Sequence, residues 1–110
     1  MDTVLAHQHS FDPSMWPFEE PANTAAFTTT RVLYDNFPVL VVSHDEDGEW
    51  QFLCGTTTAS SDGLVVCLGC AYERDLTLSQ VADLPQGWQA QRRHVGGPWE
   101  RYPPEPEAEA

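Results

Sequence analysis

The pattern of apolar and polar residues is clearest over residues 39–55, where two apolar runs flank an acidic stretch. The acidic stretch contains the pair Asp47-Gly48, and an Asp-Gly pair between two such runs is a strong signal for a β-hairpin. The pattern therefore predicts an antiparallel hairpin with an acidic tip. The acidic residues of this tip are Asp45, Glu46, Asp47 and Glu49.

The buried face of the hairpin depends on the length of its loop, because successive side chains of a strand point to opposite faces. A loop of two or of four residues ending at Gly48 places Val41 on the face of Trp50 and Phe52, and His44 on the other face. The face of Trp50 is the richer in aromatic area, so we expect it to face the core. A three-residue loop would reverse this assignment, since a shift of one residue turns every side chain over.

The remaining segments predict further short strands and one short helix. Residues 26–34 are rich in β-branched and aromatic side chains, and 64–68 are apolar on both faces, as in a central covered strand. Residues 75–84 carry apolar side chains at helical spacing. Residues 87–93 alternate with a polar outer face, as in an edge strand. We expect a core that includes Val41, Trp50, Phe52, Val66 and Trp88.

These elements predict an α+β fold with a small antiparallel sheet of four or five strands, one short helix and irregular termini. Residues 1–21 form a proline-rich, irregular arm, and we expect Trp16 and Phe18 to dock either on the domain or on a second subunit of a homodimer. Residues 22–99 form a single domain. Residues 100–110 are an acidic Pro/Glu/Ala tail that we expect to be disordered.

The charge is strongly acidic: 17 Asp and Glu face five Arg, and the net charge is -12. Nucleic acids and anionic membranes need cationic surface, so we expect neither as a partner. A basic protein partner suits this charge, and acidic solubility is the alternative explanation. Without a signal-peptide pattern or an apolar run near the ~20 residues of a spanning helix, we expect a soluble cytoplasmic protein.

Several patterns resemble metal sites without completing one. Cys67 and Cys70 form a lone CxxC, and residues three apart in a regular strand point to opposite faces unless Gly69 makes a bend. A redox motif of the thioredoxin kind would open a helix after a strand, whereas this pair ends a strand. His7 and His9 lack supporting ligands. The acidic tip lacks the distal Glu of an EF-hand. We expect no metal and no cofactor.

A nucleophile and a base at linked spacing are also missing. Cys54, Cys67 and Cys70 are the candidate nucleophiles and His44 is a candidate base, but no motif joins them. The chain has no Gly-rich phosphate loop, no Gly-x-Ser-x-Gly elbow and no Lys. We therefore expect a protein that is not an enzyme, with a small enzyme or metal protein built on these four residues as the alternative.

Two motifs carry a resemblance to known families. The run 43–55 contains His-Asp-Glu-Asp-Gly-Glu-Trp-Gln-Phe, and 83–90 contains Leu-Pro-Gln-Gly-Trp-Gln-Ala. Together they resemble an uncharacterised family of small bacterial proteins. The Gly-x-Trp-Gln-Phe-x-x-Gly core is also similar to immunity-protein-like domains that accompany bacterial toxins. This second resemblance implies an α+β fold and a protein-binding role, immunity-like or adaptor, and supplies no catalytic residues.

The sequence thus favours an acidic module that binds a protein partner. The expected binding residues are those of the acidic tip together with the histidine that precedes it. They are His44, Asp45, Glu46, Asp47 and Glu49.

Overall fold

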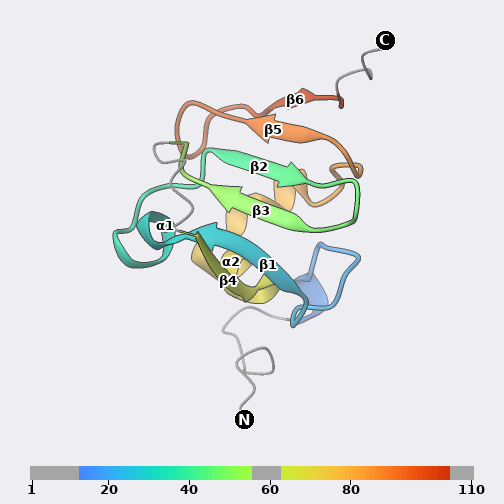
Figure 1. The fold of residues 1–110 in the computed structure, drawn as a ribbon, viewed down its shortest axis with the longest axis horizontal. Coiled ribbons are helices and arrows are strands. Elements are labelled where there is room, and N and C mark those ends of the chain that lie inside the picture. The colour runs from blue at the N-terminus through green and yellow to red at the C-terminus, as the bar shows by residue number, and fades with distance from the viewer. Residues whose placement is uncertain (1–12, 56–62, 105–110) are drawn as a thin grey trace.

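The computed structural model describes residues 13–55 and 63–104, and His7 and His9 lie outside them. The α+β class expected from the sequence is confirmed, and the fold is built on a six-stranded sheet in the order β4-β1-β3-β2-β5-β6 (Figure 1). The strands are β1 (Ala25–Thr29), β2 (Val41–His44), β3 (Trp50–Leu53), β4 (Gly63–Cys67), β5 (Gln89–Gln91) and β6 (Glu100–Tyr102).

Short helices complete the fold. They are η2 (Pro13–Met15), α1 (Thr30–Tyr34), α2 (Leu68–Arg74) and η4 (Leu76–Val81). In Figure 1, α2 lies behind the sheet, where it packs with η4 against the buried face. None of the helices in the described part of the chain has the length and apolar character needed to cross a membrane.

The sheet differs from the expected one in strand number and direction. It has six strands rather than four or five, and it is mixed, because β1 runs parallel to β3 with Phe27 opposite Gln51. The expected strand 26–34 ends early, since the side chain of Thr29 caps α1 by accepting a hydrogen bond from the backbone N–H of Val32. In the chain, α1 and β2 separate β1 from β3, and a pairing between strands that do not follow each other leaves no local signal, so periodicity could not reveal it.

Two edge assignments from the sequence are wrong. β4 was expected at the centre of the sheet, but it is an edge strand and Val65 is 61% exposed. β5 was expected at the edge, but β6 covers it, with Ala90 opposite Arg101. Residues Glu100–Tyr102 therefore belong to the sheet and not to a disordered tail. The backbone of β6 pairs with the N–H and C=O groups that the short β5 would otherwise leave unpaired at the edge of the sheet.

The hairpin register is the reverse of the expected one. The backbone N–H of Asp45 donates to Glu49 (2.7 Å), and that of Gly48 donates to Asp45 (2.9 Å), so the loop has three residues. Gly48 takes a φ of 93°, a left-handed conformation that favours glycine at the end of a three-residue loop. His44 therefore lies opposite Trp50.

This register changes which residues of β2 lie opposite Trp50 and Phe52. Val42 lies opposite Phe52 and is fully buried, while Val41 is half-buried on the other face. Trp50 and Phe52 are each 1% exposed. Val66 and Trp88 are half-buried at the margin of the core and not within it. The largest fully buried side chains are Trp50, Phe52, Leu68, Leu78, Leu84, Val42, Val81, Cys54 and Cys67.

The segment before β1 docks on the domain through its aromatic rings. Phe18 is buried and meets Trp50 edge-on at 5.1 Å between ring centroids. Trp16 meets Tyr72 of α2 at 5.6 Å, also edge-on, and its Nε1–H donates to the backbone oxygen of Glu20 (2.8 Å). Edge-on contacts of this kind are favourable beyond simple burial. They hold Glu20 beside the hairpin.

The register leads to a direct test with two neighbouring valines. Val42→Ala removes two methyl groups from a fully buried site, so we expect a loss of about 2 kcal/mol in the free energy of unfolding. Val41→Ala makes the same chemical change on the half-buried face and should cost under about 1 kcal/mol. Urea denaturation of both variants measures the difference. Equal losses, or a larger loss for Val41→Ala, would contradict the observed register.

Candidate functional site

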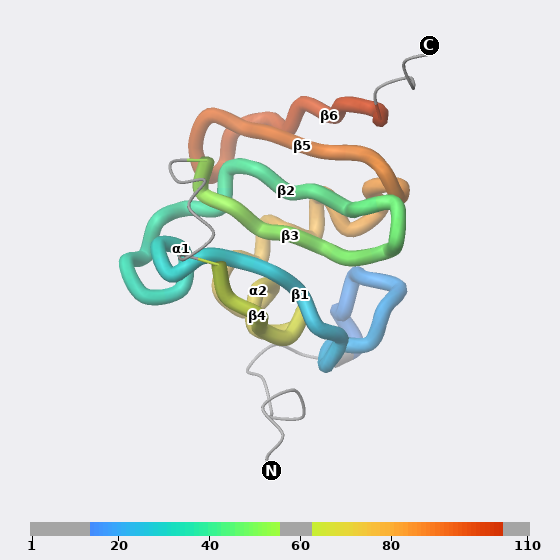
Figure 2. Tube along the Cα trace, in the orientation of Figure 1, coloured from blue at the N-terminus to red at the C-terminus, as the bar shows by residue number. Residues whose placement is uncertain are grey.

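A pocket of about 250 Å³ opens where three segments meet at one end of the sheet. These are the segment before β1, the end of the β2–β3 hairpin next to its turn, and the loop before β5, which come together on the right in Figure 2. The pocket is lined by Glu19, Glu20, His44, Trp50, Ala82, Asp83, Leu84, Pro85 and Gln86.

His44 is the centre of this pocket, and its ring is fixed on two sides. Its face stacks on Trp50, with 3.9 Å between ring centroids and 12° between planes. Its Nδ1 lies 2.7 Å from the backbone oxygen of Leu84. A carbonyl oxygen only accepts, so Nδ1 carries a proton, and in the neutral form of the ring Nε2 presents a lone pair.

That lone pair points to an acidic neighbour. Nε2 of His44 lies 3.6 Å from Oε2 of Glu20, too far for a direct hydrogen bond. Nε2 is buried, and no atom of the described residues hydrogen-bonds to it. Two acceptors therefore converge on one small space. A buried acceptor without a donor is costly, so the space suits a group that brings N–H donors or positive charge.

The rim of the pocket adds to its negative charge. Glu19 and Asp83 line it beside Glu20, and Glu19 and Asp83 are exposed. Arg101 donates to Asp83 at 2.7 Å, and this hydrogen bond holds the pKa of Asp83 below its ordinary value. Asp83 thus stays ionised but has its own cation, which leaves Glu19 and Glu20 as the acids most able to meet a ligand.

The acidic tip lies next to this pocket and is only partly available for binding. Asp45 accepts from the Ser43 hydroxyl (3.0 Å) and from the Gln51 amide (2.8 Å), so its role is to hold the turn. Carboxylate oxygens of Asp45, Asp47 and Glu49 lie within 4.8 Å of one another. The remaining tip acid, Glu46, is exposed.

Of the five residues expected to bind, the structure separates His44 from the others. Its side chain is buried in the pocket, while Glu46, Asp47 and Glu49 are exposed at the tip. Glu20 was missed by the sequence reasoning. It lies 24 positions from His44 along the chain, and no spacing links residues at such a separation.

The cysteine pair also differs from the expectation. Cys67 ends β4 and caps α2, with its Sγ accepting from the backbone N–H of Cys70 at 3.2 Å. The two Sγ atoms lie 2.8 Å apart. The pair therefore does open a helix after a strand, and its side chains converge instead of pointing to opposite faces. The bend comes from the start of α2 at Leu68, which the sequence analysis did not predict.

These thiols have no further metal ligand beside them in the described ranges. There, the one group of three candidate ligands within 4.8 Å is that of Asp45, Asp47 and Glu49. His44 is also remote from Cys67, because β2 and β4 are three strand positions apart, roughly 14 Å at the usual spacing. Cys54 follows β3 at the end of the sheet away from His44. The structure does not bring the four residues of the enzyme alternative together.

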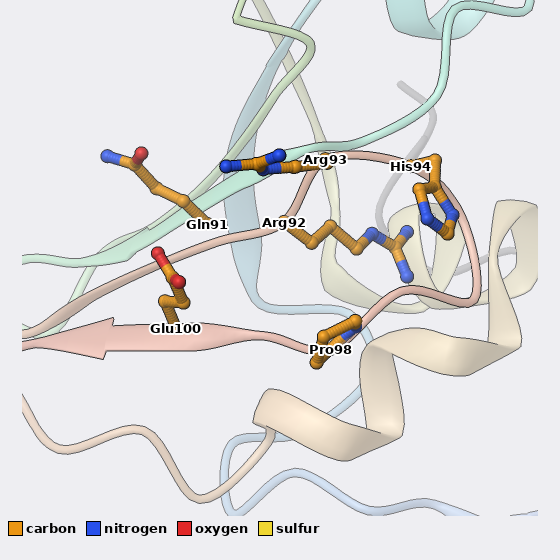
Figure 3. Close-up of a pocket in the computed structure, with 6 residues that line it drawn as sticks. All are labelled: Gln91, Arg92, Arg93, His94, Pro98 and Glu100. Atoms are coloured by element: carbon orange, nitrogen blue, oxygen red, sulfur yellow. The ribbon is translucent and has the colours of Figure 1, made fainter.

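A second pocket, of about 210 Å³, lies beside β5 and collects three of the basic side chains (Figure 3). Arg92 is buried, and its guanidinium donates to the backbone oxygen of Val39, to the Thr77 hydroxyl and to Asp75 at 2.6 Å, and stacks on Trp99. Arg93 and His94 are exposed, and Figure 3 shows the Arg93 guanidinium pointing away from Arg92. Because each nitrogen of the Arg92 guanidinium already donates to an acceptor of the protein and its charge is paired with Asp75, we assign this pocket a structural role.

Comparison of the chain with protein-family models, with curated proteins and with solved structures returned no match.

The environment of Cys70 leads to a prediction about its reactivity. Burial and then the hydrogen bond with Cys67 raise the pKa of Cys70 to about 12. The thiolate is the reactive form, and its fraction grows until pH passes the pKa. In reduced native protein, alkylation of Cys70 by iodoacetamide should rise about tenfold per pH unit from about pH 7 to about pH 10. Peptide mapping by mass spectrometry gives the rates, and a plateau near pH 9 would contradict the raised pKa.

Proposed function

We propose that this protein is a non-enzymatic binding module that receives a basic side chain of a protein partner, an arginine or a lysine, in the pocket between Glu20 and His44. The observation that carries the proposal is the convergence of two acceptors, Nε2 of His44 and the Glu20 carboxylate, 3.6 Å apart and without a donor between them among the described residues. A guanidinium group presents several N–H donors in one plane and can serve both acceptors at once.

The walls of the pocket favour a long basic side chain over a free cation as the ligand. Its walls include the ring of Trp50, Leu84 and Pro85, which offer apolar contact to the methylene stem of a long basic residue. A cation near an aromatic ring gains further stabilisation. The net charge of -12 favours a basic protein over an acidic one through long-range attraction.

The acidic tip would act on the approach of the partner. Glu46, Asp47 and Glu49 are exposed beside the pocket, and a Cβ added to Gly87 of the neighbouring loop would come within 3.4 Å of the Glu46 side chain. Exposed charges of this kind raise the rate of encounter more than they lower the rate of dissociation. A role of this kind agrees with the resemblance to immunity-protein-like domains, which implies protein binding.

The pocket can be tested with a small probe. Nα-acetyl-arginine methylamide should bind with a dissociation constant on the order of millimolar and shift the Trp50 indole and His44 ring resonances in NMR spectra. The citrulline analogue has the same shape without the charge and should bind at least about fivefold more weakly. An absence of shifts at these two residues, or equal binding of both probes, would overturn the proposal.

Variants locate the binding in the pocket. Glu20→Gln keeps the size of the side chain and should weaken arginine-probe binding by about tenfold. Glu100→Gln makes the same change in β6, on a residue outside the pocket, and should leave binding unchanged. Equal losses for the two variants would mean that only net charge matters.

The tip has a separate, kinetic test. The double variant Glu46→Lys, Glu49→Lys reverses two exposed charges and spares Asp45, whose carboxylate holds the turn. With an arginine-rich peptide as the partner, its association rate should fall several-fold at low salt, and the difference should shrink as salt is raised. Stopped-flow tryptophan fluorescence at two ionic strengths measures these association rates. Association rates that are unchanged at both ionic strengths would show that the acidic tip does not contribute to binding.

A further inference from the structure

The strongest chemistry outside the pocket is the pair of thiols at the junction of β4 and α2. Sγ of Cys67 and Sγ of Cys70 lie 2.8 Å apart, against about 2.05 Å in a formed disulfide. The backbone at this junction is fixed: Leu68 donates to Thr24 at 2.7 Å and Gly69 donates to Ala22 at 2.8 Å. The fold therefore holds the two sulfurs within a short movement of a bond.

We propose that Cys67 and Cys70 form a reversible thiol–disulfide site, which takes its oxidising equivalents from a low-molecular-weight disulfide. This site is independent of the pocket at His44. Its basis is the convergence of the two sulfurs on a backbone that hydrogen bonds to the segment before β1 hold in place. Prearrangement of two reacting groups raises their effective concentration, so the native fold should favour the bond more than the unfolded chain does.

The two cysteines have different exposure, which gives them different roles. Cys70 is half-buried, whereas Cys67 is 1% exposed. An external disulfide therefore meets Cys70 first. The Cys70 thiolate attacks one sulfur of the external disulfide, the external S–S bond breaks, and the leaving thiolate takes up the proton that Cys70 released.

The second step completes the exchange. The Cys67 thiolate attacks the Cys70 sulfur of the mixed disulfide and displaces the second small thiolate, which takes up the proton from Cys67. Two protein thiols are oxidised to one disulfide, and the external disulfide is reduced to two thiols. The raised pKa of Cys70 keeps the first step slow at neutral pH, so the site responds to redox balance over time and is not a rapid catalyst.

The test uses the full chain, reduced and then equilibrated with oxidised and reduced glutathione in varied ratios. Thiols are trapped by acid and alkylation, and mass spectrometry maps the bonds. We expect an intramolecular Cys67–Cys70 disulfide with loss of two of the three thiols. Its equilibrium constant in native protein should exceed that in guanidinium-unfolded protein by about tenfold or more. An equal or lower constant in the native state would overturn the proposal.

Three single substitutions assign the roles. Cys67→Ser retains a preferred helix cap and should accumulate a glutathione adduct on Cys70, since the resolving thiol is missing. Cys70→Ser should form neither the intramolecular bond nor an adduct on the buried Cys67. Cys54→Ser is the control, because Cys54 is buried to the same 1% but is not part of the pair, and it should keep the disulfide with an unchanged constant. A native Cys54→Ser protein without the disulfide, or an adduct on Cys67 in Cys70→Ser, would contradict the mechanism.

Discussion

The rest of the structure depends on the conformation of one residue, Gly48, at the tip of the β2–β3 hairpin. With its φ of 93°, the loop closes in three residues and His44 lies opposite Trp50. An ordinary side chain would be strained there, and a Cβ would also come within 3.3 Å of the Gln86 amide. The register that follows sends Val42, His44, Trp50 and Phe52 to one face, and that face becomes the core.

Burial of His44 has a consequence for the site. A histidine on the core face needs hydrogen bonds for its ring nitrogens, and the fold supplies a carbonyl, that of Leu84, to one of them. The other nitrogen faces Glu20 across 3.6 Å. The same stacking of His44 on Trp50 that completes the core therefore also places Nε2 beside the Glu20 carboxylate in the pocket, and this pair is the basis of the proposed binding function.

Arg92 is the counterpart of His44 on the other side of the molecule. It is buried, but three acceptors and the Trp99 ring surround its guanidinium group, so its charge is compensated. A buried ion pair with extra hydrogen bonds fixes the arrangement of the segments it joins, here β5, η4 and the chain before β2. The contrast explains why we assign function to the pocket at His44, where acceptors lack a donor, and structure to the pocket at Arg92.

The sequence by itself determined the features that arise from local pattern and composition. It predicted the α+β class, the hairpin over 39–55, burial of Trp50 and Phe52, and docking of Trp16 and Phe18, because a short run of residues carries each signal. Only the tertiary structure decided the parity of the hairpin, since loops of three and four residues fit the same Asp-Gly signal and differ by one residue in register. It also decided the parallel pairing of β1 with β3, the meeting of Glu20 with His44, and the convergence of Cys67 and Cys70. The first two of these depend on segments that are distant in the chain, about which local periodicity carries no information. The third depends on α2, which begins at Leu68, where the pattern predicted that the strand would continue.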